Sequence, residues 1–166
     1  MIFGFLFGKK NPTTNWPPFD ERPLEFELSQ GALNGVPCGR PLEHLHFLGP
    51  DQEQASSAFM NYKYYRLGLD VDCRSAHQID SYRIVVRDSY QEGYTAFVGQ
   101  LKMRGQNVEA DTLEQWIHQF GTPEQTDSDE SEAVLYYLFP NLEWQVEFDS
   151  HAMLQSIIVT DRPTLT

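Results

Sequence analysis

The sequence predicts an α+β protein built from two tandem repeats, each a short helix packed on an antiparallel sheet. Three observations support this class. Residues 24–90 and 91–166 resemble each other, a Leu-Gly-Pro phrase near position 49 is echoed by Phe-Gly-Thr-Pro near position 121, and strands of alternating hydrophobicity follow both phrases. A chain of 166 residues that is 40% apolar can bury roughly 70% of its unfolded surface. It therefore needs no metal or disulfide to fold.

The internal similarity keeps its order along the chain. The stretch LSQGALNG at 28–35 aligns with VGQLKMRG at 98–105, at an offset of 70. The offset is 72 for Gly49 and Gly121, and 75 in the strands that follow. It grows only where the sequence is typical of loops, as small insertions between two copies of one unit would produce. We divide the chain into an apolar N-terminal peptide and Pro-rich tether (1–23), a first repeat (24–90) and a second repeat (91–166).

Each repeat is expected to open with a short strand, around 24–30 and 94–101, followed by a Gly-containing turn and a helix. In the second repeat, Asp111 can cap the helix while Glu114 reaches back to it, as in a capping box. The apolar residues of this helix recur at helical spacing, which predicts one buried stripe. They are Leu113, Trp116, Ile117 and Phe120.

The first helix is predicted to open at Pro41, a residue suited to a first helical turn. Gly49 and Gly121 stand where a left-handed residue commonly ends a helix. The stretch LEWQVEF at 142–148 then alternates strictly between apolar and polar residues, and LGLDVDC at 67–73 repeats the pattern. Both stretches are typical of strands with one face in the core and one face in water.

The order of elements, the duplication and the Leu-Gly-Pro helix stop resemble the tandem repeats of the β-lactamase inhibitor protein fold, which small outer-membrane assembly lipoproteins of the SmpA/OmlA type share. The resemblance covers residues 24–161. It implies two units side by side and an open, often concave sheet that grips a protein partner. This chain departs from the group because it shows no export signal or lipid-attachment cysteine, and its two cysteines do not give one bridge per repeat. Only the architecture and the binding mode are carried over.

The charge balance is acidic, with 24 Asp and Glu against 12 Lys and Arg, a net charge of −12. Such a chain repels phosphate backbones and anionic lipid head groups, and it has no Lys/Arg cluster. We therefore expect no nucleic-acid partner, and a basic or neutral protein partner instead. The apolar run at the N-terminus is too short for a membrane span and lacks the pattern of a secretory signal. These features favour a cytoplasmic protein.

The N-terminal run itself has two interpretations. Phe3, Phe5 and Phe7 can dock on the protein's own core, or they can form an exposed apolar peptide. In the second case they meet a partner, or residues 2–7 lie shallowly in a membrane interface.

No catalytic, cofactor or metal signature emerges from the chain. His44 and His46 would point away from each other on a helix, and DSDESE at 127–132 lacks the glycine of a calcium loop. Cys38 precedes a helix and lies near Arg40, an arrangement that can activate a thiol, but no pattern of His and acid accompanies it. The glycines form neither a phosphate loop nor a dinucleotide fingerprint. We expect no enzyme, no cofactor and no metal.

The remaining candidate surface is aromatic. In YKYYRL, strand alternation would put Tyr62, Tyr64 and Arg66 on one face, and Tyr136 would repeat Tyr64. Tyr and Arg are common anchors of protein interfaces. The alternative is that these tyrosines only cover a sheet or pack under the other repeat.

The sequence therefore favours a non-catalytic interaction module, of the inhibitor, immunity-factor or adaptor type, that binds an unidentified protein through an open Tyr-rich sheet face. The alternative is a small-ligand-binding protein, or a hydrolase without a known signature, with its pocket between the repeats. A polar cleft with a buried carboxylate of perturbed pKa would favour the alternative, and a shallow concave sheet would favour the interaction module.

Overall fold

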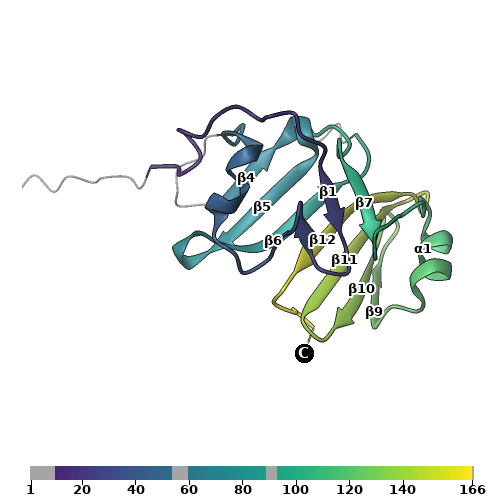
Figure 1. The fold of residues 1–166 in the computed structure, drawn as a ribbon. Helices are drawn as coiled ribbons and strands as arrows, with labels where there is room; N and C mark the ends of the chain where they lie inside the picture. Colours follow the sequence, from purple (N-terminus) through teal and green to yellow (C-terminus); the bar gives the residue numbers. More distant parts are fainter. Residues whose placement is uncertain (1–9, 54–59, 89–92, 166) are drawn as a thin grey trace, which may run out of the picture.

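The computed structural model describes residues 10–53, 60–88 and 93–165, and it contains two β-sheets that pack face to face (Figure 1). The larger sheet is antiparallel throughout, with strands in the order β4 Asn61–Tyr64, β5 Leu69–Arg74, β6 Gln78–Val85, β12 Leu154–Thr160, β11 Leu142–Asp149, β10 Glu132–Phe139 and β9 Gln125–Ser128. The smaller sheet has the order β3 Val36–Pro37, β2 Ala32–Leu33, β1 Glu25–Glu27, β7 Gln100–Met103 and β8 Gln106–Asn107. In it β1 and β7 are parallel and the other pairs are antiparallel. The helical segments are α1 Leu113–Phe120 and the 3₁₀ helices η1 Leu42–Leu48, η2 Tyr65–Leu67 and η3 Ser75–His77.

The prediction of two tandem units, each with a helix packed on its own sheet, is wrong. The described chain is mostly β, α1 has eight residues, and the 3₁₀ segments have three to seven. Both sheets also run across the predicted repeat boundary, because β6 pairs with β12 in the larger sheet and β1 with β7 in the smaller one. Backbone hydrogen bonds therefore join the two halves of the chain. The division at residue 90 stays a prediction.

Two glycine-containing turns build the smaller sheet. Asn34 and Gly35 join β2 to β3 with φ of 47° and 78°, and Arg104 and Gly105 join β7 to β8 with φ of 51° and 77°. Two consecutive left-handed residues are the mark of the type I′ turn, which matches the twist of a two-stranded hairpin. The two turns lie at the ends of residues 28–35 and 98–105, the stretches that align at an offset of 70. The aligned hairpins lie on either side of β1 in the sheet.

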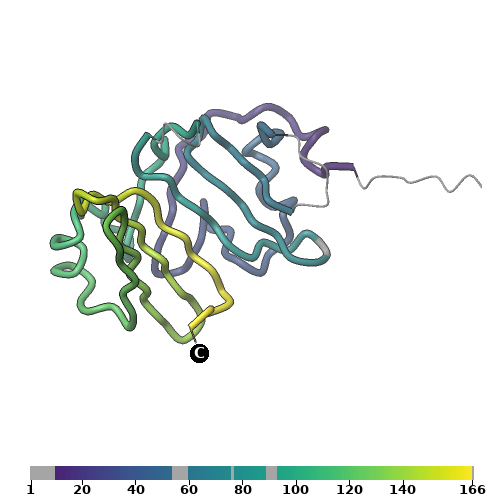
Figure 2. Tube along the Cα trace, turned by 180° about the vertical axis from the view of Figure 1, so that it is seen from behind, coloured from purple at the N-terminus to yellow at the C-terminus, as the bar shows by residue number. Residues whose placement is uncertain are grey.

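The core lies between the sheets. One row of cross-strand neighbours in the larger sheet faces inward and is at most 3% exposed: Tyr62, Val71, Tyr82, Val159, Trp144 and Tyr137. Phe26 of β1 meets Tyr82 edge-on, with ring centroids 5.3 Å apart. Trp116 of α1 is fully buried and meets Phe148 at 6.5 Å. The smaller sheet and α1 thus cover one face of the larger sheet, whose other face we call the outer face (Figure 2).

The second predicted helix is confirmed as α1, which ends at Gly121 with φ of 85°. Its cap lies one residue later than expected. The Thr112 hydroxyl accepts a hydrogen bond from the Gln115 N–H, and the Gln115 side chain accepts one from the Thr112 N–H, each at 3.2 Å. This is a capping box, but with Thr112 at the cap where Asp111 was predicted.

The strand predicted at 142–148 is confirmed as β11, which pairs with β10 along its whole length in a hairpin around Pro140 and Asn141. The first predicted helix begins after Pro41 and ends at Gly49, as expected, but it is the 3₁₀ helix η1. Its leucines Leu42, Leu45 and Leu48 are all buried in the core.

Candidate functional site

The outer face of the larger sheet carries the best candidate site, because its side chains come from adjacent strands in fixed register. One row crosses the sheet in the order Lys63, Asp70, Arg83, Ile158, Gln145 and Tyr136. Strand alternation turns these side chains away from the buried row. The side chains of this row are charged on β4–β6 and mostly apolar or aromatic on β10–β12.

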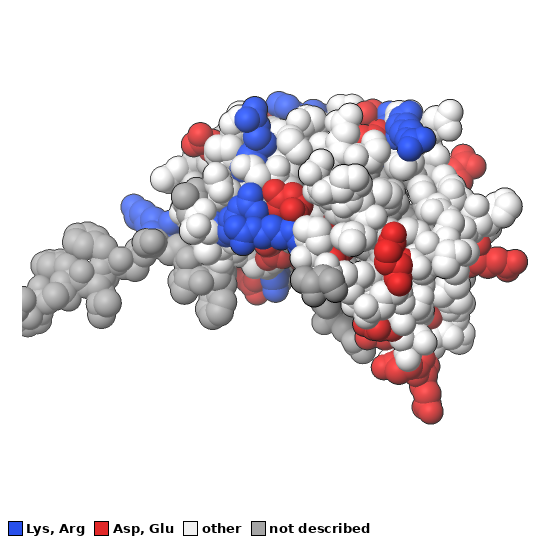
Figure 3. Space-filling view, turned by 90° about the horizontal axis from the view of Figure 1, so that it is seen from below, with Lys and Arg blue, Asp and Glu red and all other residues white. Residues whose placement is uncertain are grey.

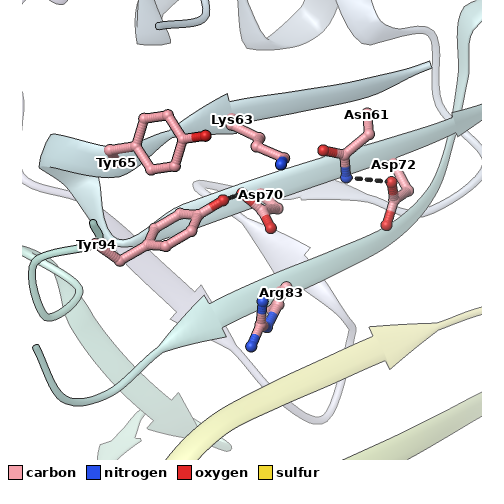
Figure 4. A pocket seen from close by; sticks show the side chains of 7 residues that line it. All are labelled: Asn61, Lys63, Tyr65, Asp70, Asp72, Arg83 and Tyr94. Carbon is pink, nitrogen blue, oxygen red and sulfur yellow. Dashed lines mark hydrogen bonds between the residues drawn. The ribbon is translucent and has the colours of Figure 1, made fainter. Parts of the chain in front are cut away.

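The charged end of this row forms a pocket of about 590 Å³ (Figure 4). We call it the polar pocket, and its lining residues are Asn61, Lys63, Tyr65, Asp70, Asp72, Arg83 and Tyr94. Strands β4, β5 and β6 supply five of them and η2 supplies Tyr65. Tyr94 comes from the segment that follows β6, which is fastened to η2 because Thr95 N donates to the Tyr65 carbonyl at 3.0 Å.

Asp70 is the recessed group of the polar pocket. It is 5% exposed, and it accepts a hydrogen bond from the Tyr94 hydroxyl. Burial raises the pKa of Asp70 to about 6, although Tyr94 and the charges of Arg83 and Lys63 favour its ionised form. Its protonation therefore changes close to neutral pH.

The other polar groups of the pocket are partly tied to one another. Asp72 accepts hydrogen bonds from the Asn61 amide nitrogen and, at 3.2 Å, from the Ser81 hydroxyl. The Asn61 Oδ1 atom is buried and has no hydrogen-bond partner within the described part of the chain. Lys63 Nζ lies 3.3 Å from Glu53.

Arg83 lines the pocket from the side of β12. Its Nε donates to the Ser156 hydroxyl at 3.4 Å, and its Nη2 lies 3.6 Å from a Glu147 carboxylate oxygen. The guanidinium therefore stands between the polar pocket and the rest of the outer face.

The other end of the outer face carries a half-exposed patch on β10, β11 and β12. We call it the Tyr136 patch, and its residues are Val134, Tyr136, Leu138, Gln145 and Ile158. Tyr136, Gln145 and Ile158 are cross-strand neighbours, and Val134 and Leu138 flank Tyr136 on the same side of β10. Leu138 is 39% exposed, and burial together with Asp127 raises the pKa of Tyr136.

The C-terminal residues border this patch. Glu143 is fully buried and accepts hydrogen bonds from Thr164 N at 2.6 Å, Thr164 Oγ1 at 2.7 Å and Leu165 N at 3.1 Å. Burial alone would raise the pKa of Glu143, but these bonds outweigh it and the pKa is lowered. Through these hydrogen bonds Glu143 holds Thr164 and Leu165 against β11.

The structure separates the residues predicted to bind a partner. Tyr62 and Tyr64 are 2% and 1% exposed, so the prediction that they face outward is wrong. Arg66 is exposed but lies in η2, away from the Tyr136 patch, and its N–H donates to Gln52. Tyr136 lies on the outer face. Phe3, Phe5 and Phe7 are outside the described residues.

Sequence reasoning missed the polar pocket. The alternation in LDVDC was visible, and it assigns Asp70 and Asp72 to the wet side of their strand. What the sequence does not show is the register that brings Lys63 and Arg83 beside them, or the loop that brings Tyr94 over Asp70.

Cys38 lies in a separate pocket between the two halves of the chain, which it lines with Asn141 and Asp161. Burial and the nearby Asp161 carboxylate raise the pKa of the Cys38 thiol to about 12. The thiol is therefore protonated at neutral pH and is a poor nucleophile. Among the described residues, no three His, Cys, Asp or Glu side chains lie close enough together to hold a metal ion.

Comparisons with protein-family models and with curated proteins give no match. Among solved structures, the chain is similar to a DUF4309 family protein (YjgB) from Bacillus subtilis subsp. subtilis str. 168, with 14% sequence identity and a TM-score of 0.48. The similarity covers 72% of this chain and 76% of the other. In the described part of this chain, no helix has the length and apolar character needed to cross a bilayer.

Proposed function

We propose that this protein is a non-catalytic binding module that holds a basic protein partner on the Tyr136 patch. The observation that carries the proposal is the patch itself: apolar and aromatic side chains gathered on one open sheet face, with Leu138 39% exposed and Tyr136 at their centre. Isolated exposed apolar residues are common, but a contiguous group on a flat face is typical of an interaction surface.

The backbone under the patch favours binding at a low entropic cost. β10 pairs with β11 over eight residues, and β11 pairs with β12. Side chains held on three paired strands lose little freedom when a partner arrives, so more of the contact energy appears as affinity. Tyr136 also has the mixed apolar and hydrogen-bonding character of a typical interface anchor.

The charge around the patch supports a basic partner. Residues 105–161 contain twelve Asp and Glu and no Lys or Arg. Figure 3 shows acidic side chains along the right and lower edges of one face, with basic ones at its centre left and upper right. Asp127, Glu143 and Glu147 are the charged groups that act on Tyr136, and an excess of acidic groups around a surface steers a partner of opposite charge and repels nucleic acid.

Inhibitor, immunity factor and adaptor are all consistent with such a module. We also propose a cytoplasmic location, which is supported by the presence of Cys38 and Cys73 as free thiols.

The test is capture of a partner from the native host's lysate with four forms of the full chain: wild type, Tyr136→Ala, Leu138→Arg and Val98→Arg. Val98 is 57% exposed and lies outside the patch, so Val98→Arg makes the same change of charge at another exposed apolar site. We expect a basic protein to be retained by wild type and Val98→Arg, and lost from both patch variants. We also expect its retention to fall as salt increases.

Circular dichroism should show that all four forms are folded. If no basic protein is captured, or if the captured protein is held equally by the patch variants, the proposed function is wrong.

A further inference from the structure

The polar pocket has a composition that favours a neutral ligand. Its two carboxylates, Asp70 and Asp72, are matched by two cations, Lys63 and Arg83, and these four charges alternate across three adjacent strands. Lys63 and Arg83 also lie 3.3 Å and 3.6 Å from the carboxylates of Glu53 and Glu147, so each cation already has an acidic partner and a charged ligand would have to displace an ion pair. A neutral polar molecule can contact all four.

The hydrogen-bonding groups of the pocket call for a ligand that donates and accepts at neighbouring atoms. Lys63, Asp70 and Arg83 are cross-strand neighbours, so a donor, an acceptor and a donor stand side by side. Beside them lies the Asn61 Oδ1 atom, a buried acceptor without a partner in the described chain. A hydroxyl group is both donor and acceptor, and a ring with adjacent hydroxyls would meet this alternation.

Two tyrosine rings give the pocket an apolar wall. The centroids of Tyr65 and Tyr94 are 4.6 Å apart, and their planes are tilted by 57°. Tyr94 is 5% exposed and is held by its hydrogen bond to Asp70, whereas Tyr65 is half-buried. Aromatic rings next to convergent polar groups suit a ligand with one C–H face and several hydroxyls.

From this we propose that the polar pocket binds a neutral polyhydroxylated ligand of the pyranose-sugar class. A volume of about 590 Å³ is within the range of small-molecule sites and has room for one or two sugar rings. Asp70 and Asn61 accept from ring hydroxyls, Lys63 and Arg83 donate to them, and Tyr65 covers the C–H face. A polar cleft with a buried carboxylate favours small-ligand binding, so the inference develops that alternative. It is separate from the proposed function because β4–β6 carry most of the pocket and β10–β12 carry the Tyr136 patch.

The test is a titration of the full chain followed by ¹H–¹⁵N NMR. The probes are the methyl glycosides of glucose, galactose, mannose and N-acetylglucosamine, the disaccharides cellobiose and chitobiose, and, as charged probes, arginine and glutamate. We expect at least one sugar to give saturable shifts at the amides of Lys63, Asp70 and Arg83, and the charged probes to give none there.

Two pocket variants and one control define the contact. Asp70→Asn and Tyr65→Ala are each expected to weaken the binding of that sugar at least about tenfold. Tyr136→Ala, on the same face but outside the pocket, should leave its Kd unchanged. The NMR spectra also report whether each variant is folded.

The inference is overturned if none of the sugars gives saturable shifts at β4–β6, if arginine or glutamate binds there and the sugars do not, or if a sugar binds with the same Kd to both pocket variants. None of these results depends on whether a protein partner is found.

Discussion

Replacing Asp70 with Asn should stabilise the fold at neutral pH and leave its stability unchanged in acid. Asp70 is 5% exposed, and its burial raises its pKa from 3.8 to about 6. Between these pH values the folded chain holds a proton that the unfolded chain has released, so this group makes the free energy of unfolding fall as pH rises from about 4 to 6. The difference between the two pKa values corresponds to about 3 kcal/mol.

Asn has nearly the shape of protonated Asp and stays neutral at every pH. Asp70→Asn should therefore exceed wild type in free energy of unfolding by up to about 3 kcal/mol at pH 8, with the difference vanishing below pH 4. Urea unfolding, followed by tryptophan fluorescence at each pH unit from 4 to 8, measures both proteins.

Asp72→Asn is the matched control for this prediction. Asp72 lies on the same side of β5 but accepts hydrogen bonds from Asn61 and Ser81 on its two oxygens, so its amide replacement gives up one acceptor and should not raise stability. A stability difference between Asp70→Asn and wild type that does not change with pH would refute the reasoning. So would an Asp70→Asn variant that is less stable than wild type at pH 8.

Three further predictions concern other parts of the fold. Gly68 has φ of 66°, and an added Cβ would lie 2.4 Å from the Phe97 backbone nitrogen, so Gly68→Ala should lower the free energy of unfolding by at least about 1 kcal/mol in urea titrations. Glu143→Gln should speed amide hydrogen exchange at Thr164 without changing exchange in the core, because it weakens the acceptor that fastens the C-terminal residues. In wild type the same release should appear only as pH falls through the lowered pKa of Glu143. Iodoacetamide should alkylate Cys38 in the folded chain at pH 8 about a thousandfold more slowly than in urea, as followed by mass spectrometry, because burial raises its pKa to about 12.

Local signals in the sequence predicted several elements well. The helical spacing before Gly121 predicts α1, and the strict alternation of residues 142–148 predicts β11 together with its inward and outward faces. These predictions succeed because each depends only on residues within one helix or one strand. The cap was misplaced by one residue because Asp111 and Thr112 are both good capping residues, and only the backbone angles decide between them.

The prediction of the fold class is wrong for a physical reason. The strands of the smaller sheet have two to four residues, which is too short to show a period, and the β1–β7 pair that joins its two hairpins brings together residues more than 70 positions apart. The prediction that Tyr62 and Tyr64 face outward is wrong because it extends the alternation of the strand through Tyr65. The chain leaves the strand there for η2, so the phase on one side of that turn does not fix the phase on the other.

Asp70 connects the stability of the sheet with the chemistry of the outer face. A buried carboxylate with a raised pKa costs the fold stability at neutral pH, whereas an amide of the same shape would fill the position at a lower cost. The fold alone therefore does not require a charge at this position.

A sugar hydroxyl that donates to Asp70 would benefit from that charge, because a hydrogen bond to an ionised acceptor is stronger than one to a neutral acceptor. The same substitution, Asp70→Asn, should then raise stability and weaken binding together, a pairing expected where a site is held at the expense of stability. If Asp70 had only a structural role, Asp70→Asn would change stability without weakening sugar binding. Measuring the free energy of unfolding and the sugar Kd of this one variant therefore separates a structural role from a binding role.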